Sequence, residues 1–542
     1  MKFRFQALVL CAALLFPGCR AEELPHIEQI EPRIGKMGDI ITIYGERFGT
    51  ERDDSYITIG GYPPITSAYI QWDDTEITIK TPESGSAGLV YLYRGNKKSN
   101  AALFSVQETI PQPVVEDTAS GIPLILSISP LQGAPGQLIK IQGRNFGPSR
   151  EGSGVYFSWN AENSPSAPVE AAVPLFVEAF ENDMAYESWS EREINVRIPD
   201  GAVSGGIEIR TPRGVSRGEY FEVTGKPGTK TFREKHSYVI SYSVDIRVRE
   251  ALQFNSLYLW IPKPVSSASQ RNTRVLSREI EPYIENYRGT SLFRLSDLAP
   301  DSGISLTQSY LVDVYTTETS VNPQLIRVPA SASALNAANT KPSAIIPSDD
   351  PEIKRFATTI VGREQNPYRK ALAIYNWICR EVTIQSKKMT GGALEALENR
   401  SADAYMASLL FCAFARASGV PAIPVAGILV DKTGESSTHF WAEFWLDNLG
   451  WIPADPALGA GAAPPQFSLG EDHAAWYFGN IDNQRIAFSR GEVNLSQMDS
   501  RGRTSYRERE YSLQNLWEEA GSGMESYSSL WSGITINGVY VE

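Results

Sequence analysis

The stretch that decides the fold of the C-terminal half runs from Ala402 to Ala422 and reads ADAYMASLLFCAFARASGVPA. Between Ala404 and Ser418 it is almost entirely apolar, a composition that predicts a helix. Gly419 stops this helix and Pro421 follows directly after it. The stretch therefore predicts a helix with a defined end.

The sequence on either side of this helix predicts another helix and then strands. Residues 368–382 carry apolar side chains at helical spacing, while residues 425–430 form a short β-branched run. After a turn at residues 432–434, HFWAEFWL at 439–446 predicts a strand with two tryptophans. A second turn leads into GWIPADP at 450–456. We expect helices followed by a hairpin of strands.

Three of these blocks, in this order and spacing, resemble the transglutaminase-like core of the papain-type superfamily. They are RASGVPA at 416–422, HFWAE at 439–443 and GWIPADP at 450–456, followed by YFGN at 477–480 and RIAFS at 485–489. The resemblance covers residues 350–492 and implies an α+β fold of the papain-like cysteine protease superfamily.

The resemblance also implies a chemistry, which is acyl transfer or hydrolysis at amide bonds. In this family a cysteine thiolate at a helix N-terminus attacks the carbonyl, a histidine on a neighbouring strand moves the proton, and an aspartate orients the imidazole. The helix N-terminus matters because its partial positive charge lowers the pKa of the thiol. Residue by residue, His439 matches the histidine and Asp455 matches the aspartate.

The cysteine of the family is missing. Its position, twelve residues before Arg416, is occupied by Ala404. A methyl group cannot attack a carbonyl, so the resemblance implies a vestigial triad of His439 and Asp455 without a nucleophile. We therefore expect a domain that is not an enzyme and that acts by binding a peptide or protein.

Other side chains could supply a nucleophile. Cys412 lies on the same helix about 12 Å from Ala404 at 1.5 Å per residue, and Cys379 lies in the apolar pattern of the preceding helix. We expect both thiols to be buried, with a disulfide between them as an alternative. Ser401 is expected to cap the helix and Ser408 to pack within it.

Two other interpretations remain open. One is an active amidase, protease or acyltransferase that uses His439 and Asp455 with a different nucleophile or an activated water. The other is that Ala404 is an engineered substitution in an active parent.

The N-terminal part of the chain contains an internal repeat. The segment PHIEQIEP at 25–32 returns as PLILSISP at 123–130, and the glycines and phenylalanine of the first copy return 98 residues later. The later half of the copy, from Trp72 onward, returns 117 residues later, at Trp189. The second copy therefore carries about 19 extra residues between Pro148 and Ser188.

Each copy has short β-branched runs bounded by glycines, the pattern of a β-sandwich. The repeated order of proline, isoleucine and glycine, ending in Gly-x-x-Phe-Gly, resembles the IPT/TIG family of immunoglobulin-like domains. We expect one such domain at residues 25–106 and another at 122–224, joined by a linker at 107–121.

A third β-rich region follows at residues 232–328, with strand patterns at 238–244, 257–262 and 309–315. It fits the accessory domain often found upstream of a transglutaminase-like core. A linker is expected at 329–349 because of its Ala, Ser, Asn and Pro content. Residues 493–542 are a C-terminal extension whose aromatic residues are expected to pack back onto the core.

The first residues have the pattern of an export signal. Lys2 and Arg4 precede a short apolar stretch, and Gly18 precedes Cys19. Residues 1–18 resemble a bacterial lipoprotein signal, which implies that Cys19 carries lipid and anchors the chain to a membrane of the cell envelope. The alternative is plain secretion with a free or paired Cys19.

Composition narrows the partners. The 50 basic and 63 acidic residues give a net charge of −13, which argues against a nucleic-acid binder. His26, His236 and His473 are far apart in the sequence and show no metal spacing, so we expect no metal and no cofactor.

The expected fold class is multidomain: two all-β immunoglobulin-like (IPT/TIG) sandwiches, a β-rich accessory domain and an α+β transglutaminase-like domain. The expected partner is a peptide or protein, including a cell-wall or surface protein.

Overall fold

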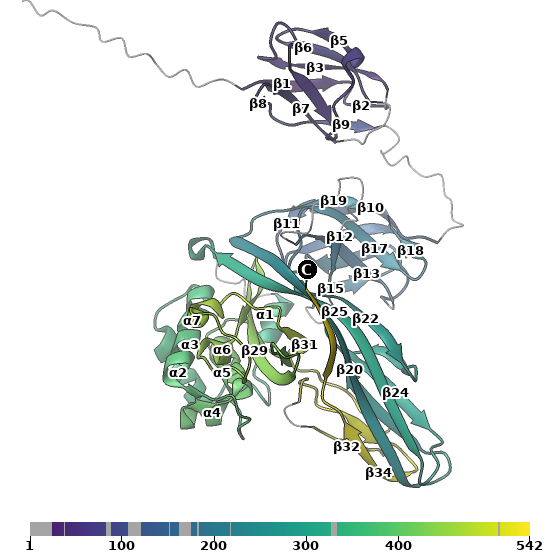
Figure 1. Cartoon of the computed structure of the whole chain (residues 1–542), viewed down its shortest axis with the longest axis vertical. Coiled ribbons are helices and arrows are strands. Elements are labelled where there is room, and N and C mark those ends of the chain that lie inside the picture. The colour runs from purple at the N-terminus through teal and green to yellow at the C-terminus, as the bar shows by residue number, and fades with distance from the viewer. Residues whose placement is uncertain are drawn as a thin grey trace, which may run out of the picture. The chain divides into compact units, whose positions relative to one another are not determined.

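The structure is a computed structural model (Figure 1). It describes residues 24–36, 38–82, 88–106, 121–150, 152–161, 175–180, 184–216, 218–326, 333–507 and 510–541. By its internal contacts the chain divides into two compact units, residues 1–120 and 121–542.

The first unit contains the first repeat, which is a sandwich of two sheets. One sheet has the order β1-β3-β6-β5 and the other β2-β9-β7-β4, with β8 paired to β7. Isoleucines alternate toward the space between the sheets, with Ile41, Ile43 and Ile77 fully buried. The strands are β1 (His26–Glu31), β2 (Ile34–Gly35), β3 (Ile40–Glu46), β4 (Tyr56–Ile59), β5 (Tyr69–Trp72), β6 (Glu76–Lys80), β7 (Gly88–Arg94), β8 (Lys97–Lys98) and β9 (Ala102–Val106).

The second repeat has the same sheets in the same order, β10-β12-β16-β15 and β11-β19-β17-β13, with β18 paired to β17. One strand is additional: β14 pairs with β13 and comes from the segment that the first repeat lacks. The strands are β10 (Leu124–Ser129), β11 (Gln132–Gly133), β12 (Leu138–Arg144), β13 (Gly154–Trp159), β14 (Leu175–Glu178), β15 (Tyr186–Trp189), β16 (Glu193–Arg197), β17 (Gly205–Thr211), β18 (Gly214–Val215) and β19 (Glu219–Val223).

The repeated residues make repeated contacts. The indole of Trp72 donates to the Gly49 carbonyl at 3.1 Å, and Trp189 donates to the Gly147 carbonyl at 3.2 Å. A Cβ added at Gly45 would lie only 2.0 Å from a backbone oxygen of β1. A Cβ added at the equivalent glycine of the second repeat would lie at the same distance from a backbone oxygen. The two copies therefore share one fold, which the same tryptophan hydrogen bond and the same close approach of a glycine to the first strand stabilise in each.

The accessory domain is a larger sandwich. Its long strands β20 (Gly228–Ala251) and β25 (Gly303–Val321) pair along almost their full length in the sheet β22-β25-β20-β34. The second sheet has the order β23-β24-β21-β33-β32. The remaining strands of this first part are β21 (Ser256–Pro262), β22 (Gln270–Arg278), β23 (Ile284–Tyr287) and β24 (Thr290–Ser296). The three strand patterns expected in this region lie within β20, β21 and β25.

The C-terminal residues complete this sandwich. β33 pairs with β21, whereas β34 and β35 both pair with β20, so the yellow C-terminal strands in Figure 1 lie beside the teal ones. Trp517 is fully buried in the accessory core. The bounds are β32 (Arg503–Ser505), β33 (Glu518–Ala520), β34 (Met524–Trp531) and β35 (Thr535–Val541). The α+β domain is thus inserted between two parts of one sandwich.

The inserted domain packs helices against the antiparallel sheet β30-β29-β28-β31. Its central helix α5 (Ala404–Ala417) is buried from Tyr405 to Arg416. The other helices are α1 (Ala334–Asn339), within the segment predicted as a linker, α2 (Pro351–Val361), α3 (Pro367–Glu381), α4 (Ala393–Asn399), α6 (Pro456–Gly459) and α7 (His473–Trp476). The strands are β26 (Thr383–Ile384), β27 (Ser401–Ala402), β28 (Ala422–Val430), β29 (Ser436–Leu446), β30 (Gly450–Ala454) and β31 (Arg485–Arg490).

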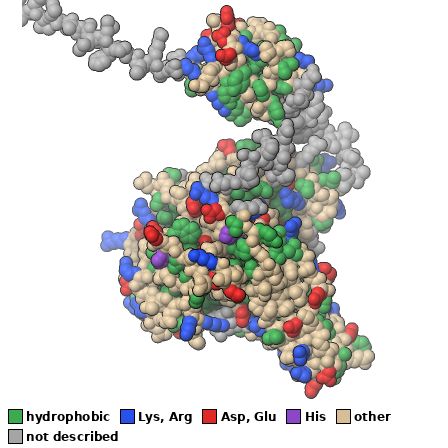
Figure 2. Space-filling model, viewed as in Figure 1, with side chains coloured by type: hydrophobic (Ala, Val, Ile, Leu, Met, Phe, Trp, Pro, Cys, Tyr) green, Lys and Arg blue, Asp and Glu red, His purple; other side chains and the backbone are tan. Residues whose placement is uncertain are grey.

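The fold class expected from the sequence is confirmed: the chain combines immunoglobulin-like sandwiches with an α+β domain. None of the helices in the described part of the chain is long and apolar enough to cross a membrane. On the face of the second unit seen in Figure 2, acidic and basic side chains are interspersed.

Candidate functional site

The structure brings His439 and Asp455 together. His439 lies in β29, and Asp455 follows β30 and caps α6 through a bond from the Leu458 N–H. Nε2 of His439 lies 2.8 Å from Oδ2 of Asp455, and the two residues are 3% and 1% exposed. Because a carboxylate can only accept, Nε2 is the protonated nitrogen that donates. Nδ1 is left as the ring nitrogen that Asp455 does not engage.

A guanidinium also holds this carboxylate. Nη1 of Arg485 lies 3.0 Å from Oδ2 of Asp455, and its other nitrogens bind Asp482. Asp482 also accepts a hydrogen bond from the Tyr477 hydroxyl at 3.0 Å. These charged groups are almost completely buried, so each depends on the others for its partners.

The charges of this network follow from their environment. Burial alone would raise the pKa of Asp455, but the neighbouring His439 and Arg485 hold it at about 2. Burial would lower the pKa of Arg485, yet the carboxylates of Asp482 and Asp455 raise it well above its ordinary value. Asp455 is therefore an anion at neutral pH that is paired with a permanent cation.

Trp441 forms a wall of this network. Its ring centroid lies 6.3 Å from that of His439, at an interplanar angle of 21°, and Cζ of Arg485 lies 4.9 Å from it. Trp445 and Trp451 pack edge to face at 5.4 Å next to Leu335. The three tryptophans therefore serve as core and wall residues.

Ala404 is the first residue of α5. The preceding Asp403 caps the helix by accepting from the Met406 N–H at 2.9 Å. The ring of Tyr405, the next residue, packs edge to face on Phe440, which follows His439, with centroids 5.0 Å apart. This contact packs the first turn of α5 against β29, one residue after His439. The position expected to hold a nucleophile carries a methyl group.

The two cysteines of the helices do not replace it. Cys412 is fully buried, and Cys379 points its sulfur at the Pro456 carbonyl at 3.6 Å. Both are free, so the alternative of a disulfide between them is wrong for this structure. Burial raises the pKa of both thiols to about 12. Neither is set up to form a thiolate near neutral pH.

The serines are structural. Ser408 is buried and donates to the Tyr405 carbonyl at 2.8 Å, as expected for packing. Ser401 was expected to cap α5, and this prediction is wrong. It lies in β27, while Asp403, which directly precedes the helix, takes the cap.

Arg485, Asp482 and Tyr477 are the site residues that sequence reasoning missed. Tyr477 and Arg485 fall within the YFGN and RIAFS blocks, but nothing in the sequence assigned them a role. The only signal in the sequence was an aspartate and an arginine three residues apart, Asp482 and Arg485, which the structure shows to be a buried ion pair. Cys19, the expected lipid attachment point, lies outside the described residues. No group of three or more potential ligands that could hold a metal occurs within the described ranges.

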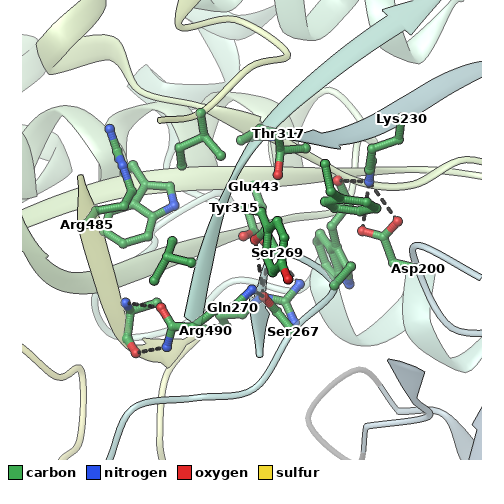
Figure 3. Close-up of a pocket in the computed structure, with 18 of the residues that line it drawn as sticks. Asp200, Lys230, Ser267, Ser269, Gln270, Tyr315, Thr317, Glu443, Arg485 and Arg490 are labelled. Carbon is green, nitrogen blue, oxygen red and sulfur yellow. Dashed lines mark hydrogen bonds and ion pairs between the residues drawn. The ribbon is translucent and has the colours of Figure 1, made fainter. Parts of the chain in front are cut away.

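A small cavity lies behind the Trp441 and Arg485 wall (Figure 3). It measures about 50 Å³, which is room for a few water molecules. Its lining comes from the second repeat, the accessory domain and the inserted domain, including Asp200, Lys230 and Glu443. In Figure 3 Lys230 and Asp200 face each other on one side and Arg485 lies on the other.

The pKa of Asp455 predicts an acid-sensitive contribution to stability. Because the folded-state pKa is below the ordinary value of 3.8, ionised Asp455 stabilises the fold above about pH 4, and this stabilisation is lost as the pH falls toward about 2. The contribution is about 2 kcal/mol. Urea unfolding across this range should show the free-energy gap between the natural chain and Asp455→Asn narrowing as the pH falls. A gap that is independent of pH would contradict the assignment.

Two known families match parts of this chain. The model of the transglutaminase-like superfamily matches residues 354–456, which include Ala404, His439 and Asp455. The model of the IPT/TIG domain matches residues 25–106.

Individual relatives are more distant. An uncharacterized protein of Haemophilus influenzae is 26% identical over 171 residues. The match covers 25% of this chain and about half (46%) of the length of that protein. Among solved structures, a candidate cysteine protease from Cytophaga hutchinsonii is 17% identical with a TM-score of 0.35, covering 58% of this chain and 91% of the other. The gamma-CGTase of Alkalophilic bacillus clarkii is 19% identical with a TM-score of 0.16, covering 37% and 26%. Residues 354–456 of this chain belong to the transglutaminase-like superfamily, and residues 25–106 form an IPT/TIG domain.

Proposed function

We propose that this chain is an exported, lipid-anchored protein of the bacterial cell envelope whose transglutaminase-like domain is catalytically inactive and binds a peptide or protein. The observation that carries the proposal is Ala404 at the start of α5, the position at which the resemblance to the transglutaminase-like core implies a thiolate. The partner is a peptide segment, including one of a cell-wall or surface protein.

The loss of the sulfur removes the covalent route. In this superfamily an acyl-enzyme forms on the thiolate, and a histidine and an aspartate alone cannot form it. Removal of one member of such a triad costs several orders of magnitude in rate. Cys412 is fully buried, as expected, whereas Cys379 is only partly buried against the helical layer; the pKa of both thiols is raised, so the proposal gives neither a nucleophilic role.

The rest of the site supports binding. Buried polar and charged groups are costly unless each has a partner, and here Asp455 is paired with both His439 and Arg485. The network fixes the orientation of the His439 ring and leaves Nδ1 for a hydrogen bond to a ligand. A peptide amide is the ligand chemistry that this superfamily handles, and with the ring proton on Nε2, Nδ1 can accept a hydrogen bond from a peptide N–H.

Export and anchoring are supported by the sequence of residues 1–18 and by Cys19 alone. A lipidated cysteine would hold the chain at a membrane while the sandwich domains lie between that anchor and the transglutaminase-like domain along the chain.

The anchor is tested by Cys19→Ser. We expect the natural chain, expressed in a bacterium, to fractionate with membranes and to carry a mass increase on its N-terminal peptide. The Cys19→Ser chain should lack the mass increase and leave the membrane fraction. A natural chain that is exported without the added mass would contradict lipidation and favour plain secretion.

The vestigial site is tested by restoring the sulfur. Ala404→Cys should react with iodoacetamide near neutral pH at least about tenfold faster than the same variant carrying His439→Ala, because the helix N-terminus and the imidazole both stabilise a thiolate. The natural chain is the matched control, since its two helical cysteines should stay unlabelled in the folded state. Peptide mapping identifies the labelled residue.

Two outcomes would contradict the proposal. Labelling of Cys379 or Cys412 in the folded natural chain, together with loss of an amidase activity, would favour the alternative of an active amidase, protease or acyltransferase with another nucleophile. An unreactive Ala404→Cys thiol in a folded chain would mean that the site has lost its superfamily geometry altogether.

A further inference from the structure

The hairpin of β29 and β30 determines the geometry of the site. His439 lies in its first strand, and Asp455 directly follows its second. The strands pair in register from Ala442 opposite Ala454 to Leu446 opposite Gly450. Any shift of β30 along β29 would therefore move the Asp455 carboxylate relative to the His439 ring.

The tip of this hairpin rests on the second repeat. A Cβ added at Gly136 would lie 2.4 Å from the Trp445 ring, so only a glycine allows this approach. The side chain of Gln137 donates to Asn448 at 3.1 Å. Gly450 lies so close to Asp200 that a Cβ there would be 2.5 Å from the carboxylate.

One ammonium group joins the three domains at this point. Lys230, in β20 of the accessory domain, lies 2.7 Å from both carboxylate oxygens of Asp200, in the second repeat. It also donates to the Trp451 carbonyl in β30 at 2.6 Å. The Lys230 side chain is 7% exposed, so its three protons are all directed at protein acceptors in a desolvated setting, as Figure 3 shows for Asp200.

The second repeat is fixed in this position by a segment that the first repeat lacks. The Phe176 carbonyl of β14 accepts a hydrogen bond from Arg271 of the accessory domain. The same guanidinium lies 3.9 Å from the ring of Trp159, which packs on Tyr315 at 5.1 Å. In the first repeat the position equivalent to Trp159 is Gly61. A Cβ added there would meet no atom within 4 Å. The two copies thus share a fold but differ in the surface used here.

From these contacts we infer that Lys230 and Asp200 are positioning residues for the His439–Asp455 pair. They act through the Trp451 carbonyl, which fixes β30 four residues before Asp455. The second repeat is then a support of the site rather than a spacer. This inference goes beyond the proposed function and holds whatever ligand the domain takes.

Lys230 would act by donating hydrogen bonds to two largely buried acceptors. When the ammonium is removed, the Asp200 carboxylate and the Trp451 carbonyl lose their donor inside a desolvated seam. The adjoining cavity of about 50 Å³ offers water a place from which to compete for both. The start of β30 is then released, and the hydrogen bond from His439 to Asp455 opens more often.

The experiment uses the full chain labelled with 15N-histidine, which gives signals from only four residues. In Lys230→Met the Nε2–H proton of His439 should exchange with water at least about tenfold faster than in the natural chain, the loss expected for one buried charge-assisted bond. The signal is assigned by its absence in His439→Gln. Gln137→Ala is the matched control, because it removes an exposed bond to the same hairpin and should leave the exchange rate unchanged.

A merely structural role would give a different result. If Lys230→Met lowers the melting temperature but leaves the His439 exchange rate as in the natural chain, the inference is overturned. If Lys230→Met does not fold, Asp200→Asn decides, since it keeps the shape of the side chain and weakens the hold on the ammonium. Faster His439 exchange in Asp200→Asn supports the inference, and an unchanged rate overturns it.

Discussion

The Asp455 carboxylate is the group on which the site depends. It is 1% exposed and accepts from the imidazole of His439, the guanidinium of Arg485 and the backbone N–H of Leu458. A buried charge of this kind is tolerated only when every partner is in place. Those partners come from β29, β31 and α6, so the carboxylate ties together three elements that are separate in sequence. The missing sulfur at position 404 leaves this arrangement untouched.

The chain order explains why the domains behave as one unit after residue 121. The C-terminal strands return to the accessory sandwich, so the transglutaminase-like domain is an insertion whose two ends are held by the same sheets. Side chains of its own sheet, such as Ile428 and Phe488, lie in the accessory core. The second repeat joins them through β14 and Lys230. We therefore expect the geometry of the His439–Asp455 pair to depend on residues of the accessory domain and of the second repeat.

Local patterns predicted what depends on local physics. The apolar run before Gly419 gave α5 to within a residue of its observed end, and the repeated glycines and isoleucines predicted two similar sandwiches. His439, Asp455 and Ala404 were assigned by the resemblance of short sequence blocks to the transglutaminase-like core rather than by local physics. The cap of α5 was assigned to Ser401 because serine is a good cap, but Asp403 is a better placed one.

Contacts between distant segments could not be predicted in the same way. Arg485 binds Asp455 from thirty residues further along the chain, and no periodicity marks such a pair. The pairing of β33 with β21 joins segments more than 200 residues apart, and the extra residues of the second repeat gave no sign that they form a docking strand. Lys230 and Asp200 look like ordinary surface charges in the sequence. Their role follows only from burial.

We propose that the natural chain binds a peptide without cutting its amide bonds. The most direct measurement incubates it with glutamine-containing peptides and with isolated cell-wall peptides, and follows both retention of peptide on the protein and any change of peptide mass by mass spectrometry. We expect the peptide to be retained intact, with no acyl adduct on any cysteine. Hydrolysis or cross-linking of the peptide amide that disappears in His439→Ala would contradict it.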